Sequence, residues 1–265
     1  MGCTDGSFGT IGGPNDFLYY DQGRLVGFLA VFSFQSSEAE LTGMVHPDYR
    51  RRGIFSGLRQ AAIAECSRRD IPNVIYINQR GSASGKAFLM RIEAAYSFSE
   101  YVMELAAETK KTYEDSLVLH SIKLRQAGRH DIELLVHLNM QGFGMSESDT
   151  REYVLQTMEG GKERTWIAEL AESNEPIGKI GAMVEMDGSS FIYGFCVLPE
   201  KRGKGYGRQI LRETIDLLIK RGQTGATKLE VAVDNEGALG LYESCGFVTV
   251  SANDYYLDKS NTTRK

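Results

Sequence analysis

The sequence predicts an α/β (α+β) fold that occurs twice in the 265 residues, complete in the second copy and truncated in the first. Three observations predict this. A short motif repeats at a distance of about 150 residues, strand-like and helix-like segments alternate along the chain, and a glycine-rich segment joins a strand to a helix. Hydrophobic residues make up 42% of the chain, which is enough to bury two cores.

The repeated motif precedes a helix in both copies. Val45-His46-Pro47-Asp48 leads, eight residues after the valine, to Gly53, and Val197-Leu198-Pro199-Glu200 leads over the same interval to Gly205. Each copy follows an apolar strand, carries basic residues before the glycine and runs into an amphipathic helix. An offset of about 150 residues has the size of a domain and is too long for a solenoid repeat.

The second copy contains every element of a complete unit, because apolar periodicity and turn signals alternate along it. The expected strands cover residues 118–124, 165–170, 177–185, 191–197 and 228–233, with a final pair of strands through Tyr256. The expected helices cover residues 131–140, 148–158, 206–221 and 236–244, and Gly222 provides a stop for the third of them.

The first copy is shorter. It opens with expected strands at 17–20 and 25–34, has a further strand at 74–78, and lacks a strand–helix–helix unit before them. Met1–Gly13 is rich in glycine and is predicted to be a loose tail. We therefore expect a truncated domain at residues 1–112 and a complete one at 117–265, joined by a polar linker near Ala106–Ser116.

Composition excludes several classes of function. The formal charge of −5 and the pI near 5.5 argue against a broad nucleic-acid-binding face. The four cysteines are widely spaced without a CxxC pattern, which argues against a disulfide framework or a metal site. No apolar stretch is long enough for a bilayer, and no secretory signal is visible. We expect a cytoplasmic protein, a monomer or homodimer, without metal, nucleic-acid or membrane partners.

Arg202-Gly203-Lys204-Gly205-Tyr206-Gly207 is the strongest chemical signal. Glycines at a strand-to-helix turn let successive main-chain N–H groups converge on one point, and the helix after them adds positive potential. This predicts a pyrophosphate site, with Arg202, Lys204 and Arg208 supplying mobile charge. The pattern lacks the Lys-Ser/Thr pair of a P-loop and the GxGxxG of a dinucleotide fold. A tight turn that serves packing alone remains the structural alternative.

These residues resemble the Gcn5-related N-acetyltransferase (GNAT) superfamily. Arg202-x-x-Gly205-x-Gly207 matches its Q/R-x-x-G-x-G/A signature, and the segment from Asn235 to Phe247 matches its second signature. The motif wording is similar to ribosomal-protein-type N-terminal acetyltransferases, and the tandem layout is similar to two-domain members with a degenerate N-terminal copy. The resemblance implies a mixed central sheet flanked by helices, and acetyl-CoA as co-substrate.

The resemblance also implies residue roles. Backbone groups of Phe195, Cys196 and Val197 should hold the pantetheine arm where the sheet splays, with an N–H near Val197 close to the thioester oxygen. Amides from Gly203 to Arg208 should bind the pyrophosphate, and Asn235 should hydrogen-bond the cofactor arm. The cofactor-binding residues expected in full are Phe195, Cys196, Val197, Arg202, Gly203, Lys204, Gly205, Tyr206, Gly207, Arg208 and Asn235.

The implied reaction is direct attack of a neutral primary amine, on a small molecule or a peptide, on the acetyl thioester. Tyr242 is the candidate acid that protonates the departing thiolate, although it could be a core aromatic. Glu230 is the candidate base, acting through water, although it could be a solvated strand charge. Cys196 and Cys245 are expected to be buried rather than to carry an acyl group. Residues 141–146, between the first two helices, and Tyr255 are candidates for the acceptor pocket.

The first copy departs from both signatures. Arg50-Arg51-Arg52-Gly53-Ile54-Phe55 keeps the first glycine but has Phe55 at the second, and Leu89 falls where Tyr242 would. We expect no chemistry in this copy, and a structural role or cofactor binding remain open for it. For the whole chain, the alternatives to a small-molecule N-acetyltransferase are a non-catalytic sensor or scaffold that binds coenzyme A, and a protein N-terminal acetyltransferase.

Overall fold

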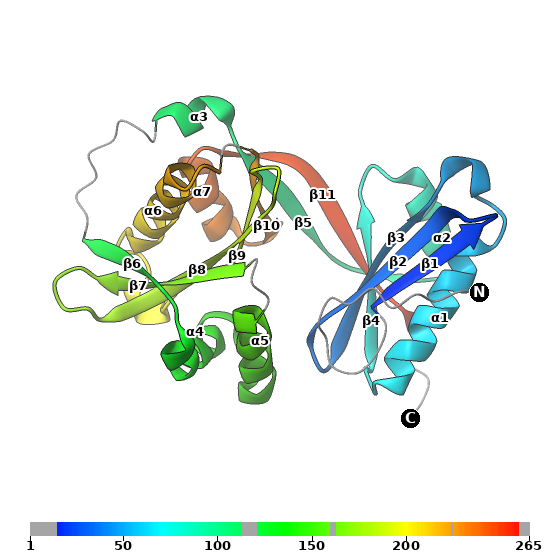
Figure 1. Cartoon of the computed structure of the whole chain (residues 1–265), viewed down its shortest axis with the longest axis horizontal. Helices are drawn as coiled ribbons and strands as arrows, with labels where there is room; N and C mark the ends of the chain where they lie inside the picture. Colours follow the sequence, from blue (N-terminus) through cyan, green and yellow to red (C-terminus); the bar gives the residue numbers. More distant parts are fainter. Residues whose placement is uncertain (1–14, 113–120, 160–162, 224, 260–265) are drawn as a thin grey trace. The chain divides into compact units, whose positions relative to one another are not determined.

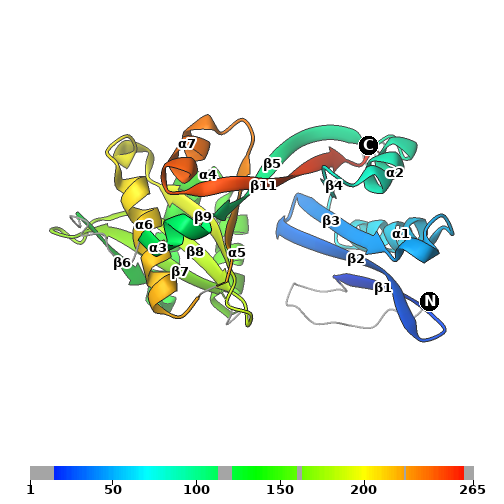
Figure 2. The ribbon, with the colours of Figure 1, turned by 90° about the horizontal axis from the view of Figure 1, so that it is seen from above.

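The computed structural model describes residues 15–112, 121–159, 163–223 and 225–259, and these fall into two compact units. The first unit comprises residues up to Ser99 together with those from Asn253 onward, and the second runs from Glu100 to Ala252. The predicted tail Met1–Gly13 lies outside the described residues. Each unit is an α/β unit with a mixed sheet and its own core (Figures 1 and 2).

The first unit forms a twisted sheet with helices packed on it. Its elements are β1 (Asp16–Asp21), β2 (Arg24–Gln35), β3 (Glu38–Val45), the 3-10 turn η1 (Pro47–Tyr49), α1 (Ile54–Arg68), β4 (Asn73–Gln79) and α2 (Ala83–Arg91). β1, β2 and β3 pair antiparallel, β3 and β4 pair parallel, and residues 253–257 pair antiparallel with β4. Apolar residues of α1 and the strands form its core, including Leu29, Leu41 and Leu58.

The second unit has helices on both faces of its sheet (Figure 1). Its elements are β6 (Ile122–Gln126), η3 (Arg129–Asp131), α4 (Ile132–Phe143), α5 (Glu147–Glu159), β7 (Glu163–Leu170), β8 (Pro176–Val184), β9 (Ser190–Val197), η4 (Pro199–Lys201), α6 (Tyr206–Lys220), β10 (Thr227–Ala232) and α7 (Glu236–Ser244). The strands β6 to β9 pair antiparallel in sequence order, and β9 pairs parallel with β10.

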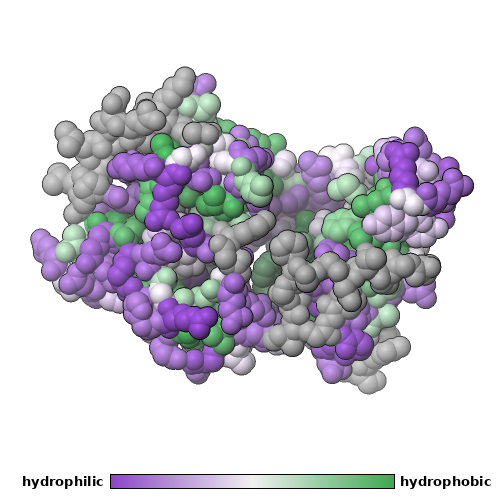
Figure 3. All heavy atoms as spheres, viewed as in Figure 1, coloured by the Kyte–Doolittle hydropathy of each residue, from purple (hydrophilic) through white to green (hydrophobic). Residues whose placement is uncertain are grey.

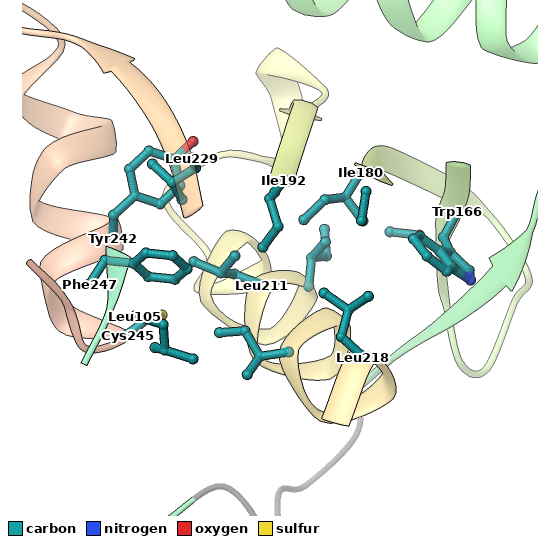
Figure 4. Close-up of a cluster of buried hydrophobic side chains, with 14 of the residues drawn as sticks. Leu105, Trp166, Ile180, Ile192, Leu211, Leu218, Leu229, Tyr242, Cys245 and Phe247 are labelled. Carbon is teal, nitrogen blue, oxygen red and sulfur yellow. The ribbon is translucent and has the colours of Figure 1, made fainter. Parts of the chain in front are cut away.

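Alternation along the strands of the second unit separates its two faces. On one face Ile180 and Ile192 pack on Leu211 and Leu218 of α6, as Figure 4 shows. On the other face α4 and α5 contribute a second cluster that includes Leu138. A strand with apolar residues on both sides must be covered twice, which explains the two layers of helices.

Two long strands divide their residues between the units. β5 (Ala95–Leu105) contributes residues 95–99 to the first unit, while its residues 100–104 pair antiparallel with β10 in the second. β11 (Phe247–Leu257) does the reverse, since Phe247 lies in the second core and Tyr256 packs on the first. The domain boundary expected between residues 112 and 117 stays a prediction about which parts of the chain fold independently. The compact units of the structure have other boundaries.

Three elements differ from the expected ones, and two of these differences follow from long-range strand pairing. A single strand, β11, replaces the expected final pair, and β5 was not predicted as a strand. The helix α3 (Ala107–Thr112) occupies the start of the expected linker, because Ala-Glu-Thr-Lys-Lys favours a helix as readily as a polar connection. Among the described residues, no helix is long and apolar enough to cross a membrane. Among the residues coloured in Figure 3, hydrophilic side chains are interspersed with hydrophobic ones.

Candidate functional site

The glycine-rich turn brings unpaired amides to the start of α6. Gly205 is the residue before the helix and has left-handed backbone angles (φ 81°, ψ −2°), and Gly203 also has a positive φ of 74°. A side chain is strained in this conformation, so glycine is the residue that allows the turn. Within the described part of the chain, the main-chain N–H groups of residues 203–208 donate no hydrogen bond, and the first amide that does is Gln209, to the Gly205 carbonyl at 3.3 Å.

Open space lies in front of these amides. A Cβ built on Gly203 or Gly205 would meet no atom within 4 Å. Arg202 precedes the turn, donates a hydrogen bond from its Nε to the Val197 carbonyl oxygen at 2.9 Å, and is exposed at the cavity. Unpaired amides at a helix N-terminus, together with basic side chains, suit a phosphate group. The residues therefore fit the diphosphate of coenzyme A.

The sheet splits beside this turn. β9 and β10 pair only as far as Ile192 and Leu229, so the rest of β9 has a free edge on the side of β10. Phe195, Cys196 and Val197 lie on this unpaired part. Strand groups without a partner strand are available to an extended ligand. The splay expected at Val197 is therefore present, while the role of these residues in binding stays a proposal.

A cavity of about 740 Å³ joins the turn to the split. It is lined by most of the residues that the sequence singled out and by several that it did not. The lining residues are Gly142, Phe143, Phe195, Cys196, Val197, Lys201, Arg202, Gly203, Gly205, Tyr206, Gly207, Arg208, Asn235, Gly237, Ala238, Gly240, Leu241 and Tyr242. Lys204 is exposed and is not among them. Gly142 and Phe143 come from the segment expected to line the acceptor side.

Tyr242 combines a core position with access to the cavity. Its side chain is 9% exposed and packs between Phe195 and Phe247, with ring centroids 6.5 and 6.2 Å away. Figure 4 shows its hydroxyl directed away from Phe247 and Leu211. Burial raises the pKa of Tyr242 to about 12, so its hydroxyl keeps its proton at neutral pH and can donate it to a forming anion.

Asn235 has a structural role that the sequence did not reveal. Its side-chain oxygen accepts a hydrogen bond from the Ala238 amide at 3.1 Å and so caps α7. Its amide nitrogen remains available to donate a hydrogen bond to a ligand. The position at the cavity is as expected, and contact with the cofactor stays a prediction.

Glu230 and Tyr255 lie apart from this cavity. The alternation predicted for β10 is present, since Leu229 and Val231 are buried, but Glu230 is exposed and does not line the cavity. Geometry thus gives no support to Glu230 as the base. Tyr255 belongs to the first unit, where its ring stacks on Phe98 at 4.3 Å. Sequence alternation predicts which side chains share one face of a strand, but it does not predict which residues or cavities that face contacts.

Cys196 is buried, and its thiol donates weakly to the Leu138 carbonyl oxygen at 3.5 Å. Burial raises the pKa of this thiol, although the nearby Lys179 opposes the shift. A thiol held in its protonated form is a poor nucleophile, in keeping with direct transfer. Among the described residues, no group of three or more His, Cys, Asp or Glu side chains is placed to hold a metal ion.

Sequence reasoning missed one charged group at this site, Lys179 of β8. It lies opposite Cys196 in the ladder and is 2% exposed. A lysine within the apolar run Ile177-Gly178-Lys179-Ile180 was the available signal, because a charge on a buried strand is costly.

Comparisons with known proteins show which proteins this chain is similar to. The sequence model of the acetyltransferase (GNAT) family matches residues 10–83 and 132–247, so it matches both halves of the chain. Mycothiol acetyltransferase of Clavibacter sepedonicus is 24% identical over 257 residues, covering 94% of this chain and 83% of that protein. N-alpha-acetyltransferase RimI of Mycobacterium tuberculosis is 45% identical over 65 residues, covering 24% of this chain and 39% of that protein.

Among solved structures, a tandem GNAT protein from the clavulanic acid biosynthesis pathway has a TM-score of 0.72 at 17% identity. The match covers 91% of this chain and 81% of that one, and at this identity it shows a shared fold. Two of the curated relatives are matched over only 18% and 39% of their own length.

Proposed function

Because the chain belongs to the acetyltransferase (GNAT) family, we propose that it transfers an acetyl group from acetyl-CoA to a primary amine of a small molecule or peptide by direct attack. One observation carries the proposal. The unpaired amides of Gly203 and of residues 205–208 open onto the same cavity as the free edge of β9 and the Tyr242 side chain. The start of any helix has unpaired amides, so what indicates a ligand site is that these amides share a cavity with a free strand edge and a tyrosine hydroxyl.

The second unit would hold the co-substrate mainly through its backbone. The amides of residues 203–208 would bind the diphosphate, with Arg202 and Arg208 adding charge. The free edge of β9 at Phe195–Val197 would bind the amide groups of the pantetheine arm as a short added strand. Acetyl-CoA, when bound, supplies the reactive thioester and a thiolate leaving group.

Tyr242 would supply the proton to the leaving sulfur. A phenol with a pKa of about 12 is a weaker acid than an alkyl thiol in water, whose pKa is about 8.5. The same apolar surroundings that raise the pKa of Tyr242 would also raise that of a thiol beside it. The two values are therefore brought closer together, and a hydrogen bond from the hydroxyl stabilises the thiolate as it forms.

The acceptor amine must lose its own proton before it attacks. A lysine-type amine has a pKa of about 10.4 and an α-amine about 8, so an α-amine needs less help at neutral pH. The two relatives described above, mycothiol acetyltransferase and N-alpha-acetyltransferase RimI, are both acetyltransferases by name. The name of the second specifies α-amines. This supports an amine acceptor without choosing between a small molecule and a peptide terminus.

A second candidate function is binding of coenzyme A without chemistry. One observation favours it: the described residues that line the cavity include no carboxylate and no histidine. A general base would then have to be water, or a group that reaches the cavity only when an acceptor is bound. Tyr242 at the cavity favours the enzyme, because a binding protein has no need of an acid there.

Two measurements separate these candidates. Titration calorimetry should show binding of coenzyme A to the full-length protein, and a thiol-release assay across amines, polyamines, aminoglycosides and short peptides should show turnover with at least one class. Binding without turnover over the whole panel would favour the second candidate. A protein that binds neither coenzyme A nor acetyl-CoA would refute both.

A further inference from the structure

The face of the second unit covered by α4 and α5 contains a buried cation that the proposed chemistry does not use. Lys179 of β8 is 2% exposed, and its Nζ lies 5.5 Å from the ring centroid of Phe143 and 6.0 Å from that of Tyr153. Aromatic faces attract an ammonium group, but they do not replace its hydrogen bonds. An ammonium group in such a place is costly unless something else pairs with it.

No protein group supplies that pairing in the described part of the chain. Lys179 makes no hydrogen bond and no ion pair within 4.0 Å there. The carboxylate that acts electrostatically on Lys179 is that of Glu163 in β7. It accepts a hydrogen bond from the Tyr193 hydroxyl at 3.2 Å. Among the described residues, no protein group therefore accepts a hydrogen bond from the ammonium group.

A second donor points to the same place. Gly194, in β9, has a positive φ of 54° and lies in a β-bulge, where the pairing of β8 with β9 shifts between Lys179 and Gly181. A Cβ built on Gly194 would lie 2.9 Å from Lys179 Nζ and 3.7 Å from the Tyr153 hydroxyl. That hydroxyl also makes no hydrogen bond among the described residues. The missing side chain of Gly194 therefore lets the ammonium group and the hydroxyl approach the same stretch of backbone.

This place adjoins the cavity. Phe143 and Cys196 line the cavity, and Phe143 also covers Lys179. The Phe143 side chain is 46% exposed, so few contacts hold it in position. Lys179 is the ladder partner of Cys196, next to the expected thioester position at Val197. A group bound at Lys179 would thus lie on the acceptor side, a short chain length from the reacting carbon.

The charges favour a monoanion. Burial lowers the pKa of Lys179 to about 8, while Cys196 and Glu163 oppose the shift, so the amine is still largely protonated at pH 7. Burial also raises the pKa of Tyr153 and keeps its hydroxyl a donor. One cation and one hydroxyl match the two oxygens of a carboxylate, whereas a phosphate dianion would need further donors.

We propose that Lys179 and Tyr153 bind a carboxylate of the acceptor, so that this protein acetylates short amines that carry a carboxylate group. The proposal rests on the proposed function, because it concerns the acceptor side of the same cavity. It assigns Lys179 and Tyr153 as specificity-determining residues, and it leaves the acid role to Tyr242.

The test compares acceptors that differ only in the carboxylate. A series of ω-amino acids from glycine to 6-aminohexanoate is assayed against the alkylamines of the same chain length, with thiol release as the readout. At one chain length, the amino acid should be preferred over the alkylamine by about 10- to 100-fold in kcat/KM, as expected of a charge-assisted hydrogen bond. Lys179→Met should abolish this preference, so that the amino acid and the alkylamine of that length differ by less than about threefold in kcat/KM.

Two further variants make the result specific. Lys220→Met removes an exposed lysine of α6 that pairs with Asp216, and it should keep the full preference. Tyr153→Phe keeps the ring and removes the hydroxyl, and it should reduce the preference in part. A wild-type protein without preference, or a preference that persists in Lys179→Met, would overturn the assignment.

Binding gives a readout that does not need turnover. If no amine of either series is acetylated, the proposed function fails, and thermal unfolding then decides the present inference. The ω-amino acids and the matching carboxylic acids should still raise the unfolding midpoint of the wild type and of Lys220→Met, but not that of Lys179→Met. Equal midpoints with and without these ligands would refute the carboxylate site.

Discussion

The two compact units contain the same backbone turn with different side chains in front of it. Gly53 precedes α1 with φ 81° and ψ −4°, and Gly205 precedes α6 with φ 81° and ψ −2°. Arg50 and Arg202 donate from Nε to the carbonyl oxygens of Val45 and Val197 at 3.0 and 2.9 Å. The strands also splay in both units, since β3 pairs with β4 only as far as Leu41.

The differences lie in the side chains that a ligand would meet. Phe55 stands where the second unit has Gly207, and its ring packs edge-on against Phe88 at 4.8 Å. Leu89 stands where the second unit has Tyr242. The first unit nonetheless has a cavity of about 1010 Å³, and Phe55 is among the residues that line it. The comparison teaches that a few local residues maintain the turn, while the groups needed for chemistry are replaced independently.

A third difference concerns the acceptor side. In the first unit Phe28 pairs with Met44 at the ladder position where the second unit pairs Lys179 with Cys196. The first unit also pairs regularly there, without the shift found at Gly194. The buried cation and the bulge therefore occur together in the second unit.

Exchanging the residues at the turn should have the largest effect. Gly207→Phe should weaken coenzyme A binding by about 1000-fold, because a side chain there displaces charge-assisted hydrogen bonds worth roughly 1.5–3 kcal/mol each. A Cβ on Gly207 would already lie 3.2 Å from Leu241 Cδ2. Calorimetry measures the loss. The matched change Phe55→Gly should leave turnover unchanged, and unaltered affinity in Gly207→Phe would show that the diphosphate binds elsewhere.

Exchanging the acid should have the next largest effect. Tyr242→Phe should lower kcat by roughly 100-fold with little change in coenzyme A affinity, because it removes a proton donor and keeps the ring. Single-turnover thiol release measures this. Leu89→Tyr, the reverse change in the first unit, should add no activity. Unchanged turnover in Tyr242→Phe would leave the thiolate to be protonated by solvent.

Replacing the buried cation should stabilise the protein. The pKa of Lys179 is about 8 in the folded state, below its ordinary value of 10.5, so the unfolded chain binds more protons between these pH values. The free-energy cost of burying the charged amine is therefore present in full below pH 8, and it disappears as the pH rises to 10.5. Lys179→Met should gain about 2 kcal/mol at pH 7 and nothing above pH 10.5.

Urea unfolding at several pH values measures this gain. Phe28→Met, at the matching position of the first unit, should give no gain that varies with pH. A destabilised Lys179→Met protein would mean that Lys179 has a partner within the folded chain.

The helix caps should show the smallest effects. Asn235 accepts from the Ala238 amide at 3.1 Å, and Ser82 accepts from the Gly85 amide at 3.2 Å in the first unit. Each change to Ala should cost about 1 kcal/mol of stability. Only Asn235→Ala should also raise the KM for acetyl-CoA. Equal KM values in the two variants would restrict Asn235 to its cap.

The turn could be predicted from the sequence because its causes are local. Gly203 and Gly205 fix the backbone, and the apolar spacing of α6 fixes the helix that follows. β5 and the single strand β11 could not be predicted in this way, since their partners lie far along the chain. The cavity position of Tyr242 followed from a motif, whereas Glu230 was chosen by strand alternation and lies outside the cavity.

The surroundings of Lys179 could not be predicted from the sequence. Its position in an apolar strand was visible, but its approach to Tyr153 depends on how α5 covers the sheet. The bulge at Gly194 likewise depends on two strands pairing out of step. Such placement results from packing between elements, so a single sequence does not determine it.

The arrangement of β11 has a consequence for how the chain is made. Its residues 253–257 pair with β4 of the first unit, although they follow the whole of residues 100–252 in the sequence. A nascent chain emerging from the ribosome therefore cannot finish the earlier unit until the later one has been synthesised. During that interval the edge of β4 that pairs with β11 stays unpaired. The second unit, whose residues are contiguous, can fold first.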